Sequence, residues 1–233
     1  MTLQEILLKL HELSDPEKVA FKKKKFGIVA TNALGIYHRD LKELAKQIGI
    51  DNEMAVQLFD SGIYEAKLLC SKIFKPADVT EDLMERWILS FENWEICDSF
   101  SMGLFSKSSN AIMKINEWSY RNPEFEKRAS YATMASYCMA DKHANNELFE
   151  SFFPLLVRES TDDRLYVKKA INWALRSIGK RNIDLNKQAI EVAKEIKQLN
   201  SRSALWIAND AIKELENKKV NILDYPRAIY RTQ

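Results

Sequence analysis

The residues best suited to chemistry lie in the segment 93–98, which reads Asn-Trp-Glu-Ile-Cys-Asp. On a helix, Trp94 and Asp98 stand one turn apart on the same face. A tryptophan beside a carboxylate would set a flat apolar wall next to a negative charge. The alternative is a core tryptophan with a solvated aspartate, and spacing alone favours that alternative.

A second segment, 164–181, is rich in basic residues. It holds six basic residues and no acid: Arg164, Lys168, Lys169, Arg176, Lys180 and Arg181. On a helix, Lys169, Arg176 and Lys180 share a face with Trp173. Cations interleaved with an aromatic side chain suit phosphates on one side and a base or sugar on the other. The alternative is a solvated helix face whose tryptophan belongs to the core.

Arg128 lies near the start of a largely apolar segment, residues 125–139. A buried or half-buried guanidinium requires a carboxylate or a phosphate as its partner. Either a nucleic-acid phosphate or a structural acid, Asp98 included, would satisfy it.

Other chemistries have no pattern to support them. The three histidines, His11, His38 and His143, are far apart and have no further ligand at metal-binding spacing. The Gly-rich phosphate-binding loops and the common hydrolase motifs do not occur. We therefore expect no metal ion, no nucleotide and no other cofactor.

The elements that must position these residues are helices. Only 6 Gly and 5 Pro interrupt the chain, and apolar residues recur every three or four positions. The period predicts about twelve helices and no sheet. They cover residues 3–13, 41–48, 55–59, 64–74, 83–89, 96–104, 111–118, 125–139, 148–157, 166–178, 189–199 and 204–215.

Helix boundaries have local signals. Asp15-Pro16 and Asn122-Pro123 each combine a capping side chain with a proline at a first-turn position, and Gly49, Gly62 and Gly179 fall near helix ends. The short connections predict helix hairpins stacked into an α-solenoid. We expect a single domain over residues 1–233, with residues 217–233 as a C-terminal tail.

Composition and charge restrict the class of protein. The chain is 46% hydrophobic and 29% charged, which is ordinary for a globular protein. It has no secretory signal pattern and no long apolar span, and Cys70, Cys97 and Cys138 look like buried reduced thiols, so we expect a soluble cytoplasmic protein. The net charge of +2 is uneven, because residues 105–233 carry 22 basic against 16 acidic side chains.

At these motifs the sequence resembles the AlkD-type DNA alkylation repair family, which includes glycosylases for N3- and N7-alkylated purines. The resemblance covers residues 15–215, in order and spacing. Its motifs are Asn93–Asp98, Lys127-Arg128-Ala129, Lys168–Arg176 and, upstream, Leu34-Gly35-Ile36.

The resemblance implies an all-α, right-handed superhelix of HEAT-like helical hairpins with a concave DNA-binding face. It implies a monomeric, monofunctional glycosylase acting on double-stranded DNA, with Asp98, Trp94, Arg128 and Trp173 at the catalytic site. Asp98 would stabilise an oxocarbenium-like sugar and position water. Phe26 falls where some members have a tyrosine, so this chain offers no hydroxyl there.

The backbone of the DNA would be held, on the same resemblance, by the basic segment. The residues expected to bind it are Lys168, Lys169, Arg176, Lys180 and Arg181. Two other functions fit the sequence. One is a non-catalytic HEAT-like protein that binds distorted or branched DNA, and the other is a protein-binding solenoid.

Overall fold

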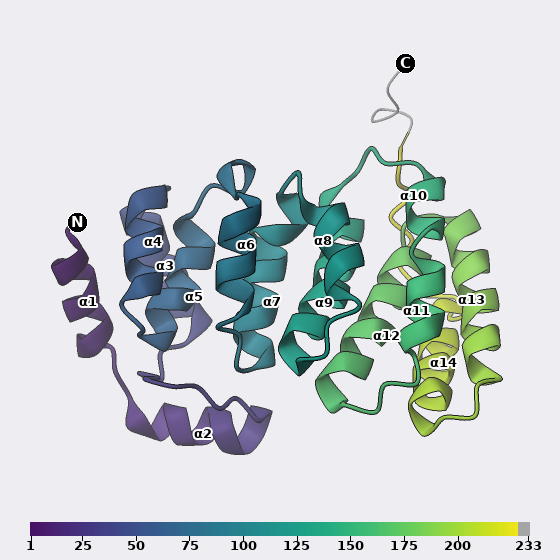
Figure 1. The fold of residues 1–233 in the computed structure, drawn as a ribbon, viewed down its shortest axis with the longest axis horizontal. Helices are drawn as coiled ribbons and strands as arrows, with labels where there is room; N and C mark the ends of the chain where they lie inside the picture. The colour runs from purple at the N-terminus through teal and green to yellow at the C-terminus, as the bar shows by residue number, and fades with distance from the viewer. Residues whose placement is uncertain (228–233) are drawn as a thin grey trace. The chain divides into compact units, whose positions relative to one another are not determined.

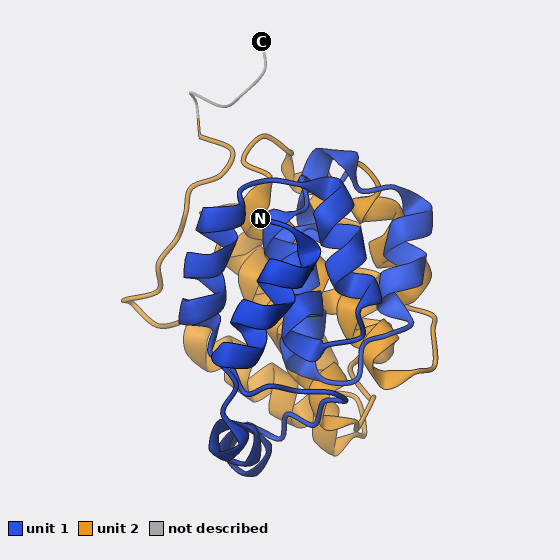
Figure 2. Cartoon of the chain, turned by 90° about the vertical axis from the view of Figure 1, so that its left-hand side faces the viewer, with its two compact units in different colours: residues 1–108 blue, residues 109–233 orange. Residues whose placement is uncertain are grey.

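The computed structural model describes residues 1–227, and among these residues it contains helices and no strand (Figure 1). The prediction of an all-α chain is confirmed. The chain forms two compact units, residues 1–108 and residues 109–233, which Figure 2 colours separately. The sequence shows no break in composition between them, and the expectation of one domain stays a prediction.

The first unit contains seven α-helices and two short 3-10 helices in its described residues. They are α1 (Leu3–Glu12), α2 (Pro16–Phe26), α3 (His38–Ile48), α4 (Asn52–Asp60), α5 (Tyr64–Ile73), η1 (Pro76–Asp78), α6 (Glu81–Ile88), α7 (Trp94–Gly103) and η2 (Phe105–Lys107). Helix α5 packs against α1, α3, α4 and α7. It is therefore the central helix of this unit.

The second unit contains the remaining helices. They are α8 (Ala111–Trp118), α9 (Glu124–Ala140), α10 (Asn146–Glu150), α11 (Phe153–Glu159), α12 (Leu165–Gly179), α13 (Ile183–Lys197) and α14 (Arg202–Leu215). Helix α12 packs against α9, α11, α13 and α14. The helix that carries the basic segment is thus the central helix of its unit.

The apolar period did not predict helix α2, because the run Lys22–Lys25 interrupts the pattern. The single helix predicted over residues 148–157 was also wrong, since two helices, α10 and α11, cover this segment. The start of α2 was readable: the Asp15 carboxylate accepts the backbone N–H groups of Glu17 and Lys18 at 3.0 and 3.2 Å. At Asn122-Pro123 the same interpretation was wrong by one residue, because Pro123 itself precedes the first turn of α9 and no side chain caps it. Helix α2 lies crosswise to α3, α4 and α5 (Figure 1).

The loop between α2 and α3 is held by one buried carboxylate. Glu65, on α5, accepts the backbone N–H groups of Leu34, Gly35 and Ile36 at 2.7, 2.8 and 3.2 Å. Gly35 has a φ of +82°, and a Cβ there would lie 2.2 Å from the carbonyl oxygen of Asp15. The motif Leu34-Gly35-Ile36 is therefore a docking point where the loop meets both α5 and the start of α2.

Each unit has its own core. In residues 1–108 it is largely aromatic, and Trp87 contacts Phe74 and Phe100 with ring centroids 5.2 and 5.3 Å apart. In residues 109–233 it is mostly aliphatic and alanine-rich, formed by α9, α11, α12, α13 and α14. Cys70, Cys97 and Cys138 are buried, as expected, and form no disulfide within the described residues.

The expected tail, residues 217–233, is described as far as residue 227. This part carries no helix and returns to the end of α12, where Leu223 N–H donates to the Lys180 carbonyl at 2.8 Å and Tyr225 N–H to the Arg181 carbonyl at 2.7 Å. Residues 228–233 lie outside the described residues. No helix in the described part of the chain is long and apolar enough to cross a bilayer.

The substitution Gly35→Ala should destabilise the protein strongly, because the new methyl group collides with the Asp15 carbonyl and also occupies the left-handed region. The matched control is Gly62→Ala, which has a φ of +73° and open space around the added Cβ. We expect a loss of about 1 kcal/mol for the control and of more than about 3 kcal/mol for Gly35→Ala, measured by urea unfolding. Equal losses would contradict the docking role of the loop.

Candidate functional site

The start of α7 is fixed by Asn93, which is 1% exposed. Its side-chain oxygen accepts the backbone N–H groups of Glu95 and Ile96 at 2.9 and 3.2 Å, and its side-chain amide donates to the Val29 carbonyl at 3.0 Å. The Tyr64 hydroxyl lies 2.9 Å from the same oxygen. Asn93 therefore caps α7 and ties it to α5 and to the loop after α2.

Trp94 and Asp98 lie in the first turns of α7, and both are half-buried. The Trp94 indole N–H donates to the Phe26 carbonyl at 3.0 Å. Both residues line one open pocket of about 630 Å³ within residues 1–108. The helical spacing seen in the sequence thus brings the tryptophan and the carboxylate to a common, solvent-accessible surface.

The same pocket contains basic side chains that the sequence did not single out. His38 and Lys42 come from α3, Lys72 from α5 and Lys107 from η2. Burial lowers the pKa of Lys72 below its ordinary value, and the positive charge of Lys42 lowers it further, while Glu95 opposes both effects. Apart from Glu95, the other charged or titratable side chains that line this pocket with Asp98 are basic.

A buried polar cluster centred on Glu95 adjoins the pocket, and Glu95 and His38 line it. We call this group the Glu95 cluster; its other members are Lys22, His38 and Tyr64. Lys22 Nζ lies 2.8 Å from Glu95 Oε2, the Tyr64 hydroxyl donates to the same oxygen at 2.9 Å, and His38 Nε2 lies 3.3 Å from Glu95 Oε1. Lys22, Tyr64 and Glu95 are all buried. The cluster joins α2, α3 and α5 to α7.

The charge of Glu95 is strongly favoured in this cluster. Burial alone raises the pKa of a carboxyl group, but hydrogen bonds from His38, Lys22 and Tyr64, with the Lys22 charge, lower the pKa of Glu95 to about 2. Burial and the neighbouring Glu95 carboxylate raise the pKa of Tyr64 above its ordinary value. Glu95 is therefore an anion and Tyr64 a neutral donor over the physiological pH range.

Phe26 ends α2 and contributes its backbone rather than its ring to the site. Its carbonyl accepts the Trp94 indole N–H, and its exposed ring packs edge-on against Phe21, with the centroids 5.8 Å apart. Lys23, Lys24 and Lys25 are exposed, whereas Lys22 is buried against Glu95. The basic run at the end of α2 is thus a solvated face except for its first member.

Arg128 lies in the first half of α9 and is buried. One of its guanidinium nitrogens donates to the Tyr166 carbonyl, in the first turn of α12, at 2.6 Å. The expectation of a buried guanidinium in an apolar helix is therefore met. Part of its hydrogen-bonding capacity serves to join α9 to α12.

The basic segment is α12 and the residues that follow it. Lys169 is exposed, Trp173 is half-buried against the core, and Lys168 Nζ lies 5.7 Å from the centre of the Trp206 ring. Arg176 and Lys180 both form salt bridges with Glu214 on α14, and Lys180 does so at 2.7 Å. The basic residues expected on one face of α12 are present, but Glu214 on α14 neutralises part of their charge.

Arg181 does not fit a role in DNA binding. It is 0% exposed, and its guanidinium donates to the carbonyls of Asp141 and Ala144 at 2.6 and 3.2 Å. It also lies 3.7 Å from the centre of the Phe149 ring. Assigning Arg181 to the DNA backbone was wrong, because its cation is enclosed by backbone carbonyls and an aromatic ring. Its role is to hold the end of α9 against the end of α12.

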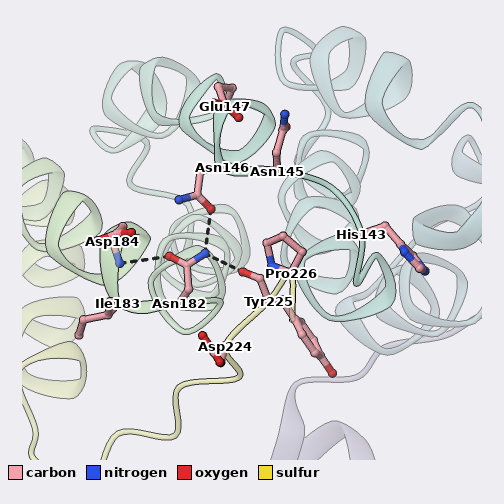
Figure 3. A pocket seen from close by; sticks show the side chains of 10 residues that line it. All are labelled: His143, Asn145, Asn146, Glu147, Asn182, Ile183, Asp184, Asp224, Tyr225 and Pro226. Atoms are coloured by element: carbon pink, nitrogen blue, oxygen red, sulfur yellow. Dashed lines mark hydrogen bonds between the residues drawn. The ribbon is translucent and has the colours of Figure 1, made fainter. Parts of the chain in front are cut away.

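The C-terminal segment helps to form a second pocket, of about 540 Å³, within residues 109–233 (Figure 3). Asn182 lies in its wall, and its amide donates to Asn146 Oδ1 at 2.8 Å and to the Tyr225 carbonyl at 2.6 Å. Its side-chain oxygen caps α13 by accepting the N–H of Asp184 at 3.1 Å. Through these hydrogen bonds, Asn182 has a structural role: it joins α10, the start of α13 and the C-terminal segment.

The structure brings Trp94 and Asp98 together in residues 1–108, and it places Arg128 and Trp173 on packed helices in residues 109–233. Convergence of the four residues stays a prediction. The sequence reasoning missed Glu95, His38 and the pocket lysines. Only Glu95 had a local signal, as an acid between Trp94 and Asp98. Within the described residues, no group of three or more His, Cys, Asp or Glu side chains could hold a metal ion.

Comparison with known proteins gives the family and the fold. Residues 6–215 match the family model described as DNA alkylation repair enzyme. A solved structure from a family related to the HEAT-like repeat DNA glycosylases, with affinity for branched DNA structures, aligns with a TM-score of 0.76 and 20% identity. The alignment covers 95% of this chain and 97% of that one, and it shows the HEAT-like fold. No curated protein is significantly similar in sequence.

A second solved structure, an engineered protein, is only weakly similar. It aligns with a TM-score of 0.39 and 15% identity over 76% of this chain and 90% of that one.

The substitution Glu95→Gln should destabilise the protein by about 3 kcal/mol at neutral pH, because the pKa of Glu95 lies about two and a half units below its ordinary value. Because the pKa of Glu95 is lower in the folded state than in the unfolded chain, its charge stabilises the folded state at pH values above the ordinary pKa of a glutamate. This contribution is lost as the pH falls toward about 2. The difference in the free energy of unfolding between the variant and the wild type should therefore be smaller by about 2 kcal/mol at about pH 3 than at about pH 7, as measured by urea unfolding. The exposed Glu53→Gln is the control, and a pH-independent difference for Glu95→Gln would contradict the cluster.

Proposed function

The chain belongs to the DNA alkylation repair enzyme family, and from that membership we propose that it hydrolyses the N-glycosidic bond of cationic N3- or N7-alkylated purines in duplex DNA. The observation that carries the proposal is the placement of Trp94 and Asp98. They lie one turn apart and line the same open pocket, which three lysines also line. This combination offers a carboxylate to a sugar and cations to its flanking phosphates.

The chemistry requires little acid catalysis. Alkylation at N3 or N7 leaves the purine positively charged, so it departs as a neutral base with the electron pair of the glycosidic bond. The sugar then carries an oxocarbenium-like charge, which a fixed carboxylate stabilises. Asp98 supplies that carboxylate and orients the water whose oxygen bonds to C1′, and the proton released by the water passes to Asp98 or to solvent.

The other site residues have supporting roles in this proposal. Trp94 packs against the deoxyribose and excludes water, which strengthens the field of Asp98. Arg128 binds a phosphate near the lesion, and Trp173 packs against the backbone. Lys168, Lys169, Arg176 and Lys180 hold the backbone by contacts that do not depend on sequence. Arg181 is left out because it is buried.

The substitution Asp98→Asn tests the catalytic role. It keeps the size of the side chain and removes the charge that stabilises the sugar, so release of 7-methylguanine and 3-methyladenine from methylated DNA should slow by at least about 100-fold. Release is measured by chromatography of the free bases under single-turnover conditions. The companion variant Asp82→Asn, an exposed residue in the first turn of α6, should release bases at the wild-type rate.

Equal release by the wild type and Asp98→Asn would contradict the catalytic role of Asp98. Failure of the wild type itself to release either base would sink the glycosylase function. Urea unfolding of each variant separates these results from misfolding.

A second function is favoured by the structural likeness to a family with affinity for branched DNA structures. In this alternative the chain binds branched DNA through charge and shape and performs no hydrolysis. Exposed Lys169 and half-buried Arg176 and Lys180 would then matter, while the charge of Asp98 would not.

Binding to a four-way junction and to a linear duplex of equal length distinguishes the two functions. For the branched-DNA function we expect tighter binding to the junction, no change with Asp98→Asn, and weaker binding when Lys169, Arg176 and Lys180 are all changed to Gln. Equal affinity for both DNAs, together with base release by the wild type, would contradict it.

A further inference from the structure

We propose that Lys42, Lys72 and Lys107 form a binding site for the phosphates of a DNA backbone, beside Trp94 and Asp98. We call these three residues the lysine site. The inference rests on the proposed function in one respect only, that the partner is DNA. It adds residues of the N-terminal unit to a DNA contact that the sequence pattern placed in α12.

The lysine site is assembled from three separate elements. Lys42 lies on α3, Lys72 on α5 and Lys107 on η2, and all three line the pocket that contains Trp94 and Asp98. Lys42 and Lys107 are exposed and Lys72 is half-buried. The fold thus gathers three cations at one concave, solvent-accessible place.

In the described part of the chain these cations are not paired with a carboxylate, although the nearby charge of Glu95 acts on Lys72. Within residues 1–227, none of the three forms a salt bridge, whereas nearby Lys46 pairs with Glu43 at 2.7 Å and Lys75 with Asp78 at 3.4 Å. Besides Asp98, the pocket is lined by one other acid, Glu95, which is already engaged by Lys22 and His38. The lysine site therefore keeps a net positive charge that an incoming anion can neutralise.

The surroundings of Lys72 point the same way. Its charge is disfavoured by burial and by Lys42, as the lowered pKa indicates. A phosphate bound between these side chains would offset both effects. In α12, by contrast, Arg176 and Lys180 already share Glu214, so the lysine site is the less neutralised of the two cationic surfaces.

The walls of the pocket favour a nucleic-acid backbone over a free anion. Apolar surface from Ile50, Phe74 and Met102 lines the pocket with the lysines. A deoxyribose or base can cover such surface while its phosphates contact the ammonium groups. An inorganic phosphate would use only the cations.

The test is the salt dependence of binding to an undamaged linear duplex. Each lysine that contacts a phosphate contributes about 1 to the slope of log K against log salt. The variant in which Lys42, Lys72 and Lys107 are all Gln should therefore show a slope smaller by about 3 than that of the wild type. The matched control changes Lys9, Lys46 and Lys67 to Gln, which removes the same charge from the same unit outside the pocket.

A slope reduction no larger than that of the control would overturn the proposal. If the triple variant unfolds, the exposed pair Lys42→Gln and Lys107→Gln replaces it, with an expected reduction of about 2. The charge-preserving pair Lys42→Arg and Lys107→Arg should keep the wild-type slope, and loss of the slope in that pair would also count against phosphate binding.

The result is independent of the glycosylase assay. A reduced slope with no base release by the wild type would leave the lysine site standing and remove the proposed hydrolysis. Base release by the wild type with an unchanged slope would support the proposed hydrolysis and contradict the lysine site. Competition by inorganic phosphate at equal ionic strength distinguishes a site for a free anion from a site for a DNA backbone. Displacement of the duplex at millimolar phosphate would show a free-anion site and contradict a backbone site.

Discussion

The buried carboxylate of Glu95 is the group on which the arrangement of the N-terminal unit depends. A buried charge is tolerated only where partners surround it, and here Lys22, His38 and Tyr64 come from three different helices. Satisfying Glu95 therefore fixes α2, α3 and α5 against α7 at one point. Because Trp94 and Asp98 lie on the same turns of α7, the cluster also fixes the rotation that turns them toward the pocket.

The helical character of the fold could be read from the sequence because most helices bury an apolar face of regular period. Helix α12 is such a case, with Val167, Ala170 and Ile171 all buried. Helix α2 could not be read in that way, since it is held by the Lys22–Glu95 pair and the Trp94 contact to Phe26 instead of by an apolar stripe. The described part of the tail has no period either, and backbone hydrogen bonds to the Lys180 and Arg181 carbonyls hold it in place.

The parts of the candidate site that are close together in the sequence could be predicted. The parts that only the packing of separate elements brings together could not. Trp94 and Asp98 are one helical turn apart, so their proximity follows from the helix itself. Lys42, Lys72 and Lys107 lie on separate elements, and only the packing of α3, α5 and η2 brings them to one pocket. The prediction that Arg181 binds the DNA backbone was wrong for a related reason. Arg181 belongs to a basic run in the sequence, but the carbonyl groups that bind it lie about 40 residues earlier in the chain.

The two proposals bear on each other through charge. In the free protein, three lysines share the pocket with Asp98 and oppose the field of its carboxylate. A phosphate on the lysine site would cancel that opposition, and the DNA itself would displace water and lower the local dielectric. The carboxylate would then act on the sugar at full strength only with a backbone in place. A cationic purine, repelled by bare lysines, would meet a neutralised surface once its own flanking phosphates had bound. In such a site the substrate's backbone is part of the electrostatic environment that stabilises the transition state.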